Sequence, residues 1–201
     1  MLFRSKLWRS SDEKSYHLEY GYSCMGYEIA GGLGVKLAAP EREVFVLVGD
    51  GSYLMMAQEL ATAIQEGIKI NVVLFDNHGF SSIGGLSESV GCDGFATEFR
   101  QRTASGDLDG PCLDVDYAAN AASLGAAAVT ATDAASLGRA IADARASRDT
   151  TVIVVPVDRE ARVGGYESWW DVPVAETSTL EAVRTARAEY DENRRRQRTF
   201  P

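Results

Sequence analysis

The sequence predicts an α/β protein built on a doubly wound parallel sheet, with a helical tail at its C-terminus. Two apolar runs, residues 44–48 and 70–75, each end in a polar turn, and a helical pattern lies between them. Strand, helix and strand in this order form a parallel βαβ unit. The β-branched run at residues 151–157 adds another buried strand. Both polar turns therefore lie at the carboxyl ends of neighbouring strands, where open α/β sheets bind ligands.

The first half of the chain predicts one helix before the first strand and one after it. Residues 21–39 open with a glycine-rich turn and continue as a helix of small residues, which suits close packing against another backbone. After the first strand, Met56, Leu60 and Ile64 share one stripe of a helix. These two helices and the first strand would position the first polar turn.

The α/β alternation resumes in the second half of the chain. A helix rich in alanine and leucine precedes a short strand at residues 126–130. Asp133 is expected to cap a helix that runs to about Ser147. Pro156 indicates the end of its strand or a position at a sheet edge. A charged helix over residues 179–196 forms the predicted tail.

We expect three parts along the chain. Residues 1–20 have no clear period and are interpreted as a connector from an upstream region that this sequence lacks. Residues 21–160 form the ligand-binding α/β domain, and residues 161–201 form a C-terminal extension with a helix. Residues 80–111 are the longest stretch without a sustained period, and long segments of this kind are usually functional or mobile. This stretch is expected to cover the ligand site.

Composition argues against several classes of protein. The net charge of −9 disfavours nucleic acid as a partner, because that binding needs basic patches. No segment approaches the ~20 apolar residues of a membrane-spanning helix, so we expect no membrane association. The cysteines are odd in number and lack CxxC spacing, which argues against a disulfide framework and a zinc site. A cytoplasmic protein with reduced thiols is the expectation.

The first polar turn, Gly49 to Ser52, has the residue types of a phosphate site. Gly49 and Gly51 permit a tight turn and let a ligand approach the backbone closely. Ser52 lies where the following helix begins, and free N–H groups at a helix start favour phosphate.

The second polar turn adds the ligands for a metal ion. Asp50 supplies a carboxylate and Asn77 an amide oxygen, and the intervening helix returns the chain so that both can face one point. Hard oxygen ligands beside a diphosphate suit Mg²⁺. The alternative is an ordinary βαβ unit with polar turns, since Gly-Asp-Gly alone is a common tripeptide. Its combination with Asp-Asn-x-Gly twenty-four residues later is more specific.

This pattern resembles the diphosphate-binding signature of thiamine-diphosphate enzymes, so the sheet is expected to be of the type that binds the cofactor's diphosphate. The resemblance implies thiamine diphosphate and Mg²⁺ as cofactors. It assigns the metal to the side chains of Asp50 and Asn77 and to the carbonyl of Gly79. The usual Asn-Asn pair is Asp76-Asn77 here. The residues expected to contact the cofactor are Met25, Gly49, Gly51, Ser52, His78 and Gly79. Met25 matches the large apolar residue that holds the cofactor bent.

Longer segments are similar to the trihydroxycyclohexane-1,2-dione acylhydrolases of inositol catabolism. They read EYGYSCMGYEIAGGLGVKLA, DNHGFSSIGGLSESVG, DVDYAANAASLGA and ESWWDVPVAE, and the resemblance covers nearly the whole chain from Lys6 onward. It implies hydrolysis of a C–C bond in a small polyol dione, yielding 5-deoxyglucuronate. Tyr27 and Glu28 stand where decarboxylases and synthases carry Pro-Ala, which disfavours an acetolactate-synthase-like or decarboxylase fragment. Rossmann-type binding is disfavoured because the glycines at residues 31–34 precede the first strand.

The resemblance leaves the catalytic residue unassigned in this chain. In such enzymes a Glu on a pyrimidine-binding domain activates the cofactor, and that domain normally lies upstream. We therefore expect the chain to be a fragment, a truncated frame or a split subunit, matching the C-terminal third of the hydrolases. The expected partners are a pyrimidine-binding domain or subunit and further copies in a homo-oligomer, and the isolated chain should be inactive. The alternative is a noncatalytic binding subunit.

Overall fold

The computed structural model describes residues 8–19, 21–161, 169 and 171–198. The chain divides into two compact units, which are described separately. The sheet unit contains the described residues up to Phe80 and residues 113–161. The tail unit contains residues 81–112 and the described residues after 161. The domain boundaries expected at residues 20 and 160 stay predictions.

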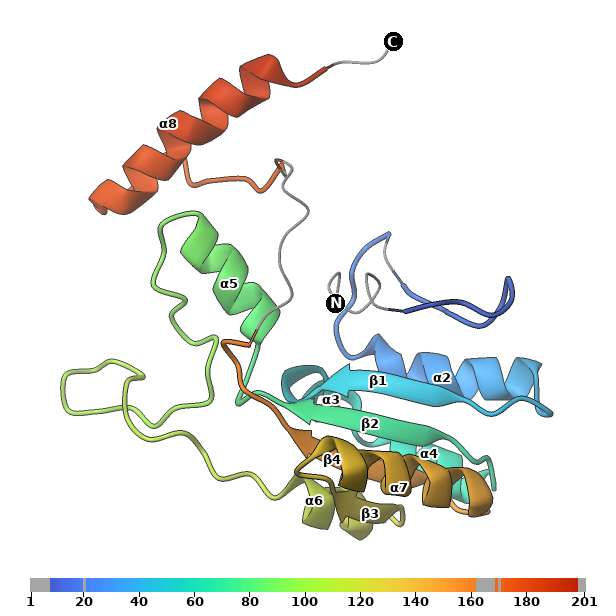
Figure 1. Cartoon of the computed structure of the whole chain (residues 1–201). Helices are drawn as coiled ribbons and strands as arrows, with labels where there is room; N and C mark the ends of the chain where they lie inside the picture. Colours follow the sequence, from blue (N-terminus) through green and yellow to red (C-terminus); the bar gives the residue numbers. More distant parts are fainter. Residues whose placement is uncertain (1–7, 20, 162–168, 170, 199–201) are drawn as a thin grey trace. The chain divides into compact units, whose positions relative to one another are not determined.

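The sheet unit is built on four parallel strands in the order β1-β2-β4-β3 (Figure 1). The strands are β1 (Phe45–Gly49), β2 (Asn71–Asp76), β3 (Ala127–Thr130) and β4 (Thr151–Pro156). β2 and β4 lie at the centre and are buried along most of their length, as their continuous apolar runs predict. Pro156 is the last residue of central strand β4, so it marks a strand end and not a sheet edge.

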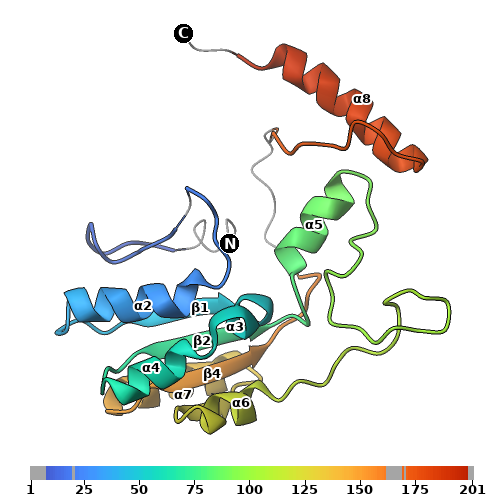
Figure 2. The ribbon, with the colours of Figure 1, turned by 180° about the vertical axis from the view of Figure 1, so that it is seen from behind.

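Helices cover both faces of the sheet, which confirms the predicted doubly wound α/β fold (Figures 1 and 2). One face packs against α2 (Tyr27–Ala38), α3 (Asp50–Met56), α4 (Glu59–Gln65) and α6 (Tyr117–Ser123). The other face packs against α7 (Ala134–Ala146). Side chains alternate along each strand, so Val72 joins the first core cluster and Val73 the second.

Two helices lie between β1 and β2 where the sequence predicts one continuous helix. α3 ends at Met56 and α4 begins at Glu59. The residues between them keep helical dihedral angles, but the Leu60 and Ala61 N–H groups donate to carbonyls three residues back. The break is therefore a tightened 3₁₀-type turn.

The later elements of the sheet unit follow the sequence closely. The Asp116 side chain caps α6 by accepting the Ala119 N–H at 2.8 Å. Asp133 caps α7, and with Ser136 it forms a reciprocal capping box. The predicted helix from Asp133 to about Ser147 is thus confirmed, with Ser147 as its C-terminal cap.

The tail unit contains α5 (Ser81–Ser89), a helix within residues 80–111 that the sequence, which shows no sustained period there, does not indicate. Farther along, Arg100 and Cys112 form an isolated antiparallel bridge. α8 (Glu181–Arg196) is the predicted charged tail helix. Among the described residues, no helix combines the length and apolar character needed to cross a membrane.

Candidate functional site

The two polar turns of the sheet unit meet at the carboxyl ends of β1 and β2. Gly49 pairs with Phe75 in the parallel register, so the two strands end side by side. The Asp50 carboxylate accepts the Gly79 N–H through Oδ2 at 2.7 Å and the Asn77 N–H through Oδ1 at 3.3 Å. The structure therefore brings together Asp50, Asn77 and Gly79, the three predicted metal ligands. Their role as ligands stays a prediction.

Asp50 is completely buried, which is unusual for a carboxylate. Burial raises the pKa of Asp50, and the backbone N–H groups of Asn77 and Gly79 counteract part of that rise. The nearby Asp76 carboxylate raises the pKa further. A cation bound at these turns would relieve both the desolvation of Asp50 and its repulsion from Asp76.

Gly51 fits the first turn because a side chain would collide with the second turn. A Cβ atom at Gly51 would lie 2.5 Å from a ring carbon of Phe80 and 2.9 Å from the Gly79 carbonyl oxygen. Asp50 thus contacts the second turn through its side chain, and Gly51 packs closely against that turn through its backbone. Only glycine permits this close packing of the two turns.

The second turn adopts an uncommon backbone conformation. His78 has φ = 58° and Gly79 has φ = 139°. A non-glycine residue in the left-handed region costs on the order of 1 kcal/mol, and such residues cluster at functional sites. The Asp76 carboxylate accepts the His78 N–H at 3.1 Å, which stabilises the turn, while the His78 side chain is half exposed. Asp76, which stands where the usual signature has Asn, therefore still accepts the His78 N–H that stabilises this turn.

One carboxylate with neutral oxygens is the donor set that Mg²⁺ bound to a diphosphate requires. In the described ranges, no group of three or more His, Cys, Asp or Glu side chains could hold a metal ion. Zinc or iron would need such a group, whereas Mg²⁺ fills its octahedron with phosphate oxygens and water. The residues at the two turns therefore fit Mg²⁺ with a diphosphate.

Comparison with known families classifies the chain. Residues 2–155 match the family model described as "Thiamine pyrophosphate enzyme, C-terminal TPP binding domain". The chain belongs to the thiamine pyrophosphate enzyme family. The expected thiamine diphosphate cofactor follows from this membership.

Individual relatives of this thiamine pyrophosphate enzyme domain share one name. A 3D-(3,5/4)-trihydroxycyclohexane-1,2-dione hydrolase of Geobacillus thermodenitrificans is 47% identical over 189 residues, which is 94% of this chain and 30% of the relative. The Clostridium botulinum protein of the same name is 48% identical over 182 residues, or 90% of this chain and 28% of the relative. The resemblance to these hydrolases is confirmed. The chain spans about 30% of the length of the curated relatives it matches.

A solved structure supports the same classification. The thiamine diphosphate-dependent 4-hydroxybenzoylformate decarboxylase of Rhodococcus jostii RHA1 aligns with a TM-score of 0.54 and 25% identity. The alignment covers 67% of this chain and 23% of the decarboxylase. The parallel sheet is therefore the fold of a thiamine diphosphate-dependent enzyme.

In this thiamine pyrophosphate enzyme domain, the Met25 turn packs against α3. Gly26 has φ = 90°, and a Cβ atom there would lie 3.0 Å from Cβ of Met55. Upstream, the Glu19 carboxylate accepts the N–H groups of Tyr22 and Cys24, and these bonds lower its pKa. Met25 itself is 39% exposed, so its apolar side chain is available to a ligand. Its contact with the cofactor stays a prediction.

Ser52 and Gly49 flank the start of α3. Gly49 is the N-terminal cap in an extended conformation, and Ser52 is the third residue of the helix. The helix thus begins two residues earlier than the sequence predicts, because Asp50 and Gly51 already belong to it. The expected contacts of both residues with a diphosphate stay predictions.

A buried tyrosine pair beneath Asp50 is the part of the site that sequence reasoning missed. The Tyr117 hydroxyl donates to Asp50 Oδ2 at 3.3 Å, and the Tyr53 hydroxyl donates to Asn120 Oδ1 at 2.8 Å. The two rings meet edge to face with centroids 5.9 Å apart. The sequence predicts the helix that starts near Tyr117, but no local pattern links that residue to Asp50, sixty-seven positions away.

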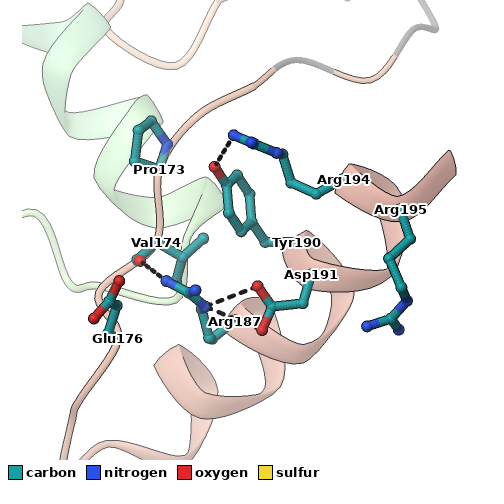
Figure 3. Close-up of a pocket in the computed structure, with 8 residues that line it drawn as sticks. All are labelled: Pro173, Val174, Glu176, Arg187, Tyr190, Asp191, Arg194 and Arg195. Atoms are coloured by element: carbon teal, nitrogen blue, oxygen red, sulfur yellow. Dashed lines mark hydrogen bonds and ion pairs between the residues drawn. The ribbon is translucent and has the colours of Figure 1, made fainter. Parts of the chain in front are cut away.

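The tail unit contains a separate cavity of about 550 Å³ along α8 (Figure 3). Its lining residues are Pro173, Val174, Glu176, Arg187, Tyr190, Asp191, Arg194 and Arg195. The three arginines are paired: Arg187 with Asp191, Arg194 with Asp171 and Arg195 with Glu192. Because acidic side chains neutralise these arginines, the cavity does not offer the positive charge of an anion site.

Proposed function

We propose that this chain forms the Mg²⁺- and thiamine-diphosphate-binding part of a cytoplasmic enzyme of inositol catabolism. The enzyme would add water across the C–C bond between the two carbonyls of 3D-(3,5/4)-trihydroxycyclohexane-1,2-dione and release 5-deoxyglucuronate. The observation that carries this proposal is the 47% identity to hydrolases of this name over 94% of the chain. The meeting of the two polar turns at Asp50 supports it.

The residues of this chain would act by holding the cofactor in place. The Asp50 carboxylate, the Asn77 amide oxygen and the Gly79 carbonyl would hold Mg²⁺, and the metal would anchor the diphosphate. When bound, thiamine diphosphate supplies the reactive carbon and the electron sink that cleavage beside a carbonyl requires. Correct positioning of reacting groups can lower a barrier by up to ~7–11 kcal/mol.

The remaining contacts would set the shape and position of the cofactor. Gly49, Gly51 and Ser52 would contact the diphosphate from the first turn, and His78 from the second. Met25 would support the bent conformation of the cofactor from the start of α2. All these roles are positional, so no residue of this chain is assigned a proton-transfer step.

The activating Glu would come from a pyrimidine-binding domain or subunit, with further copies assembling a homo-oligomer. The chain spans about 30% of its curated relatives, which leaves ample length for such a domain in those proteins. On this proposal the 201-residue chain alone would lack hydrolase activity. Copurification with a chain that carries the missing Glu would favour the catalytic proposal over a noncatalytic binding subunit.

A synthase or decarboxylase is the second candidate, favoured by the decarboxylase structure that shares the fold at 25% identity. The higher identity to dione hydrolases argues for the first candidate. Assaying the reconstituted enzyme with the cyclic dione and with pyruvate separates them. Acetolactate formation without dione cleavage would refute the hydrolase proposal and leave the metal site intact.

The metal site itself is tested by substituting Asp50. Asp50→Ala removes the only charged ligand and should abolish Mg²⁺-dependent binding of thiamine diphosphate in titration calorimetry. Asp133→Ala removes an exposed carboxylate that caps α7 and should bind like the unsubstituted chain. Circular dichroism verifies that both variants fold. Equal affinity in Asp50→Ala and the unsubstituted chain would remove the assignment.

A further inference from the structure

The Tyr117 hydroxyl is a donor to the carboxylate at the centre of the candidate site. It lies 3.3 Å from Asp50 Oδ2, the same oxygen that accepts the Gly79 N–H at 2.7 Å. Resting on the proposed function, we propose that Tyr117 is a positioning residue, which holds the Asp50 carboxylate in the orientation that binds Mg²⁺. Tyr117 acts through Asp50 and has no role in contacting substrate.

The position of the Tyr117 hydroxyl is determined by two neighbouring elements. Tyr117 is the first residue of α6, whose start is held by the Asp116 side chain. Its ring stands edge-on to the buried ring of Tyr53 in α3, with an interplanar angle of 88°. Both rings are at least 97% buried, so neither has room to turn away from its partner. The hydroxyl is therefore fixed before any ligand binds.

The hydrogen bond runs from Tyr117 to Asp50 and not the reverse. An ionised carboxylate only accepts hydrogen bonds, so the phenol must donate. A phenol has an ordinary pKa of about 10, so the Tyr117 hydroxyl keeps its proton at neutral pH. Hydrogen bonds to the charged form of a carboxylate favour that form, and a metal ion requires it.

The neighbouring Tyr53 provides a control within the same cluster. Its hydroxyl is also buried, but it donates to the Asn120 side chain at 2.8 Å and not to Asp50. Tyr53→Phe and Tyr117→Phe thus each remove one buried hydroxyl and keep the ring. A role in stability alone would affect both variants alike, whereas a positioning role affects the metal only in Tyr117→Phe.

The test measures metal binding by the full 201-residue chain in the presence of thiamine diphosphate. Mn²⁺ replaces Mg²⁺ as the probe, because electron paramagnetic resonance counts the free ion directly. Groups that orient metal ligands typically change metal affinity 10–100-fold, and the 3.3 Å bond puts the expected loss in Tyr117→Phe at about 10-fold. Tyr53→Phe should stay within about twofold. Urea unfolding of both variants verifies that they remain folded.

Each result supports or overturns the inference. Wild-type affinity in Tyr117→Phe overturns it, and so does an equal loss in Tyr53→Phe. If the unsubstituted chain shows no metal-dependent binding, the proposed function fails, and this inference fails with it. If the unsubstituted chain binds metal and only the expected difference between the variants is absent, this inference alone fails. If Tyr117→Phe does not fold, nuclear magnetic resonance of ¹³C-labelled tyrosines in the unsubstituted chain decides. The Cζ signal of Tyr117 should then shift on metal binding, and an unchanged signal refutes the role.

Discussion

Gly51→Ala tests whether the two polar turns pack as closely as the structure indicates. The added Cβ atom would lie 2.5 Å and 2.6 Å from two ring carbons of Phe80, and 2.9 Å from the Gly79 carbonyl oxygen. Contacts shorter than 3.0 Å require movement, and the Gly79 oxygen belongs to the backbone. The substitution should therefore push the second turn away from the first.

The expected loss of stability combines two opposing effects. Overpacking a tight site costs ~1–3 kcal/mol. Gly51 lies in α3, where alanine is favoured over glycine by ~0.5–1 kcal/mol. We therefore expect a net loss of ~1–2 kcal/mol in the free energy of unfolding, or a melting temperature lowered by ~2–8 °C.

Gly34→Ala is the matched control, because the same change in α2 meets open space. Nothing lies within 4 Å of a Cβ atom at Gly34, so only the helical preference remains. The free energy of unfolding of that variant, measured by thermal and urea unfolding, should rise by ~0.5–1 kcal/mol.

Gly51→Ala should also weaken Mg²⁺-dependent binding of thiamine diphosphate, because it displaces the Gly79 carbonyl. The packing argument fails if Gly51→Ala is as stable as Gly34→Ala.

Two further predictions concern α7 and the acidity of Asp50. Asp133→Ala removes the capping box of α7 and should lower the free energy of unfolding by about 1 kcal/mol. The control Asp143→Ala on the same helix should change the free energy of unfolding by less than ~0.5 kcal/mol. Equal effects in thermal unfolding would contradict the capping role. Because the pKa of Asp50 is raised, protons should compete with Mg²⁺ at a higher pH than for an ordinary aspartate, and affinity should fall as pH decreases through that raised pKa. Calorimetry in buffers of different ionisation enthalpy should detect proton release on metal binding at pH values near the raised pKa. An affinity that does not change with pH in this range would contradict the upward shift of the Asp50 pKa.

The elements that could be predicted from sequence are those with a strong local cause. β2 and β4 are continuous apolar runs, and α7 starts at a residue that caps it with its own side chain. α5 was missed because Ser81–Ser89 contains serines and two glycines and only one buried residue, so no apolar stripe marks a helix. The break between α3 and α4 was missed because its residues keep helical dihedral angles.

The candidate site likewise contains residues that local sequence predicts and one that depends on tertiary packing. Asp50, Gly51 and Asn77 lie in turns whose residue types and spacing indicate a ligand, and the parallel register places those turns side by side. Tyr117 reaches Asp50 only through the packing of α6 against α3, which depends on tertiary structure. The only signal in the sequence is a tyrosine at the start of a predicted alanine-rich helix. This signal does not indicate which residue Tyr117 contacts.

The arrangement around Asp50 explains how one carboxylate could define the proposed metal site. Both oxygens of this buried group accept hydrogen bonds, two from backbone N–H groups of the second turn and one from Tyr117. Tyr117 belongs to the first core cluster, and the β1–β2 register places the second turn beside Asp50, so the fold itself orients the carboxylate. A Mg²⁺ ion would then need few protein ligands, because phosphate oxygens and water would complete its shell. A cation bound at Asp50 would offset the cost of burying this carboxylate, and metal binding would then stabilise both turns.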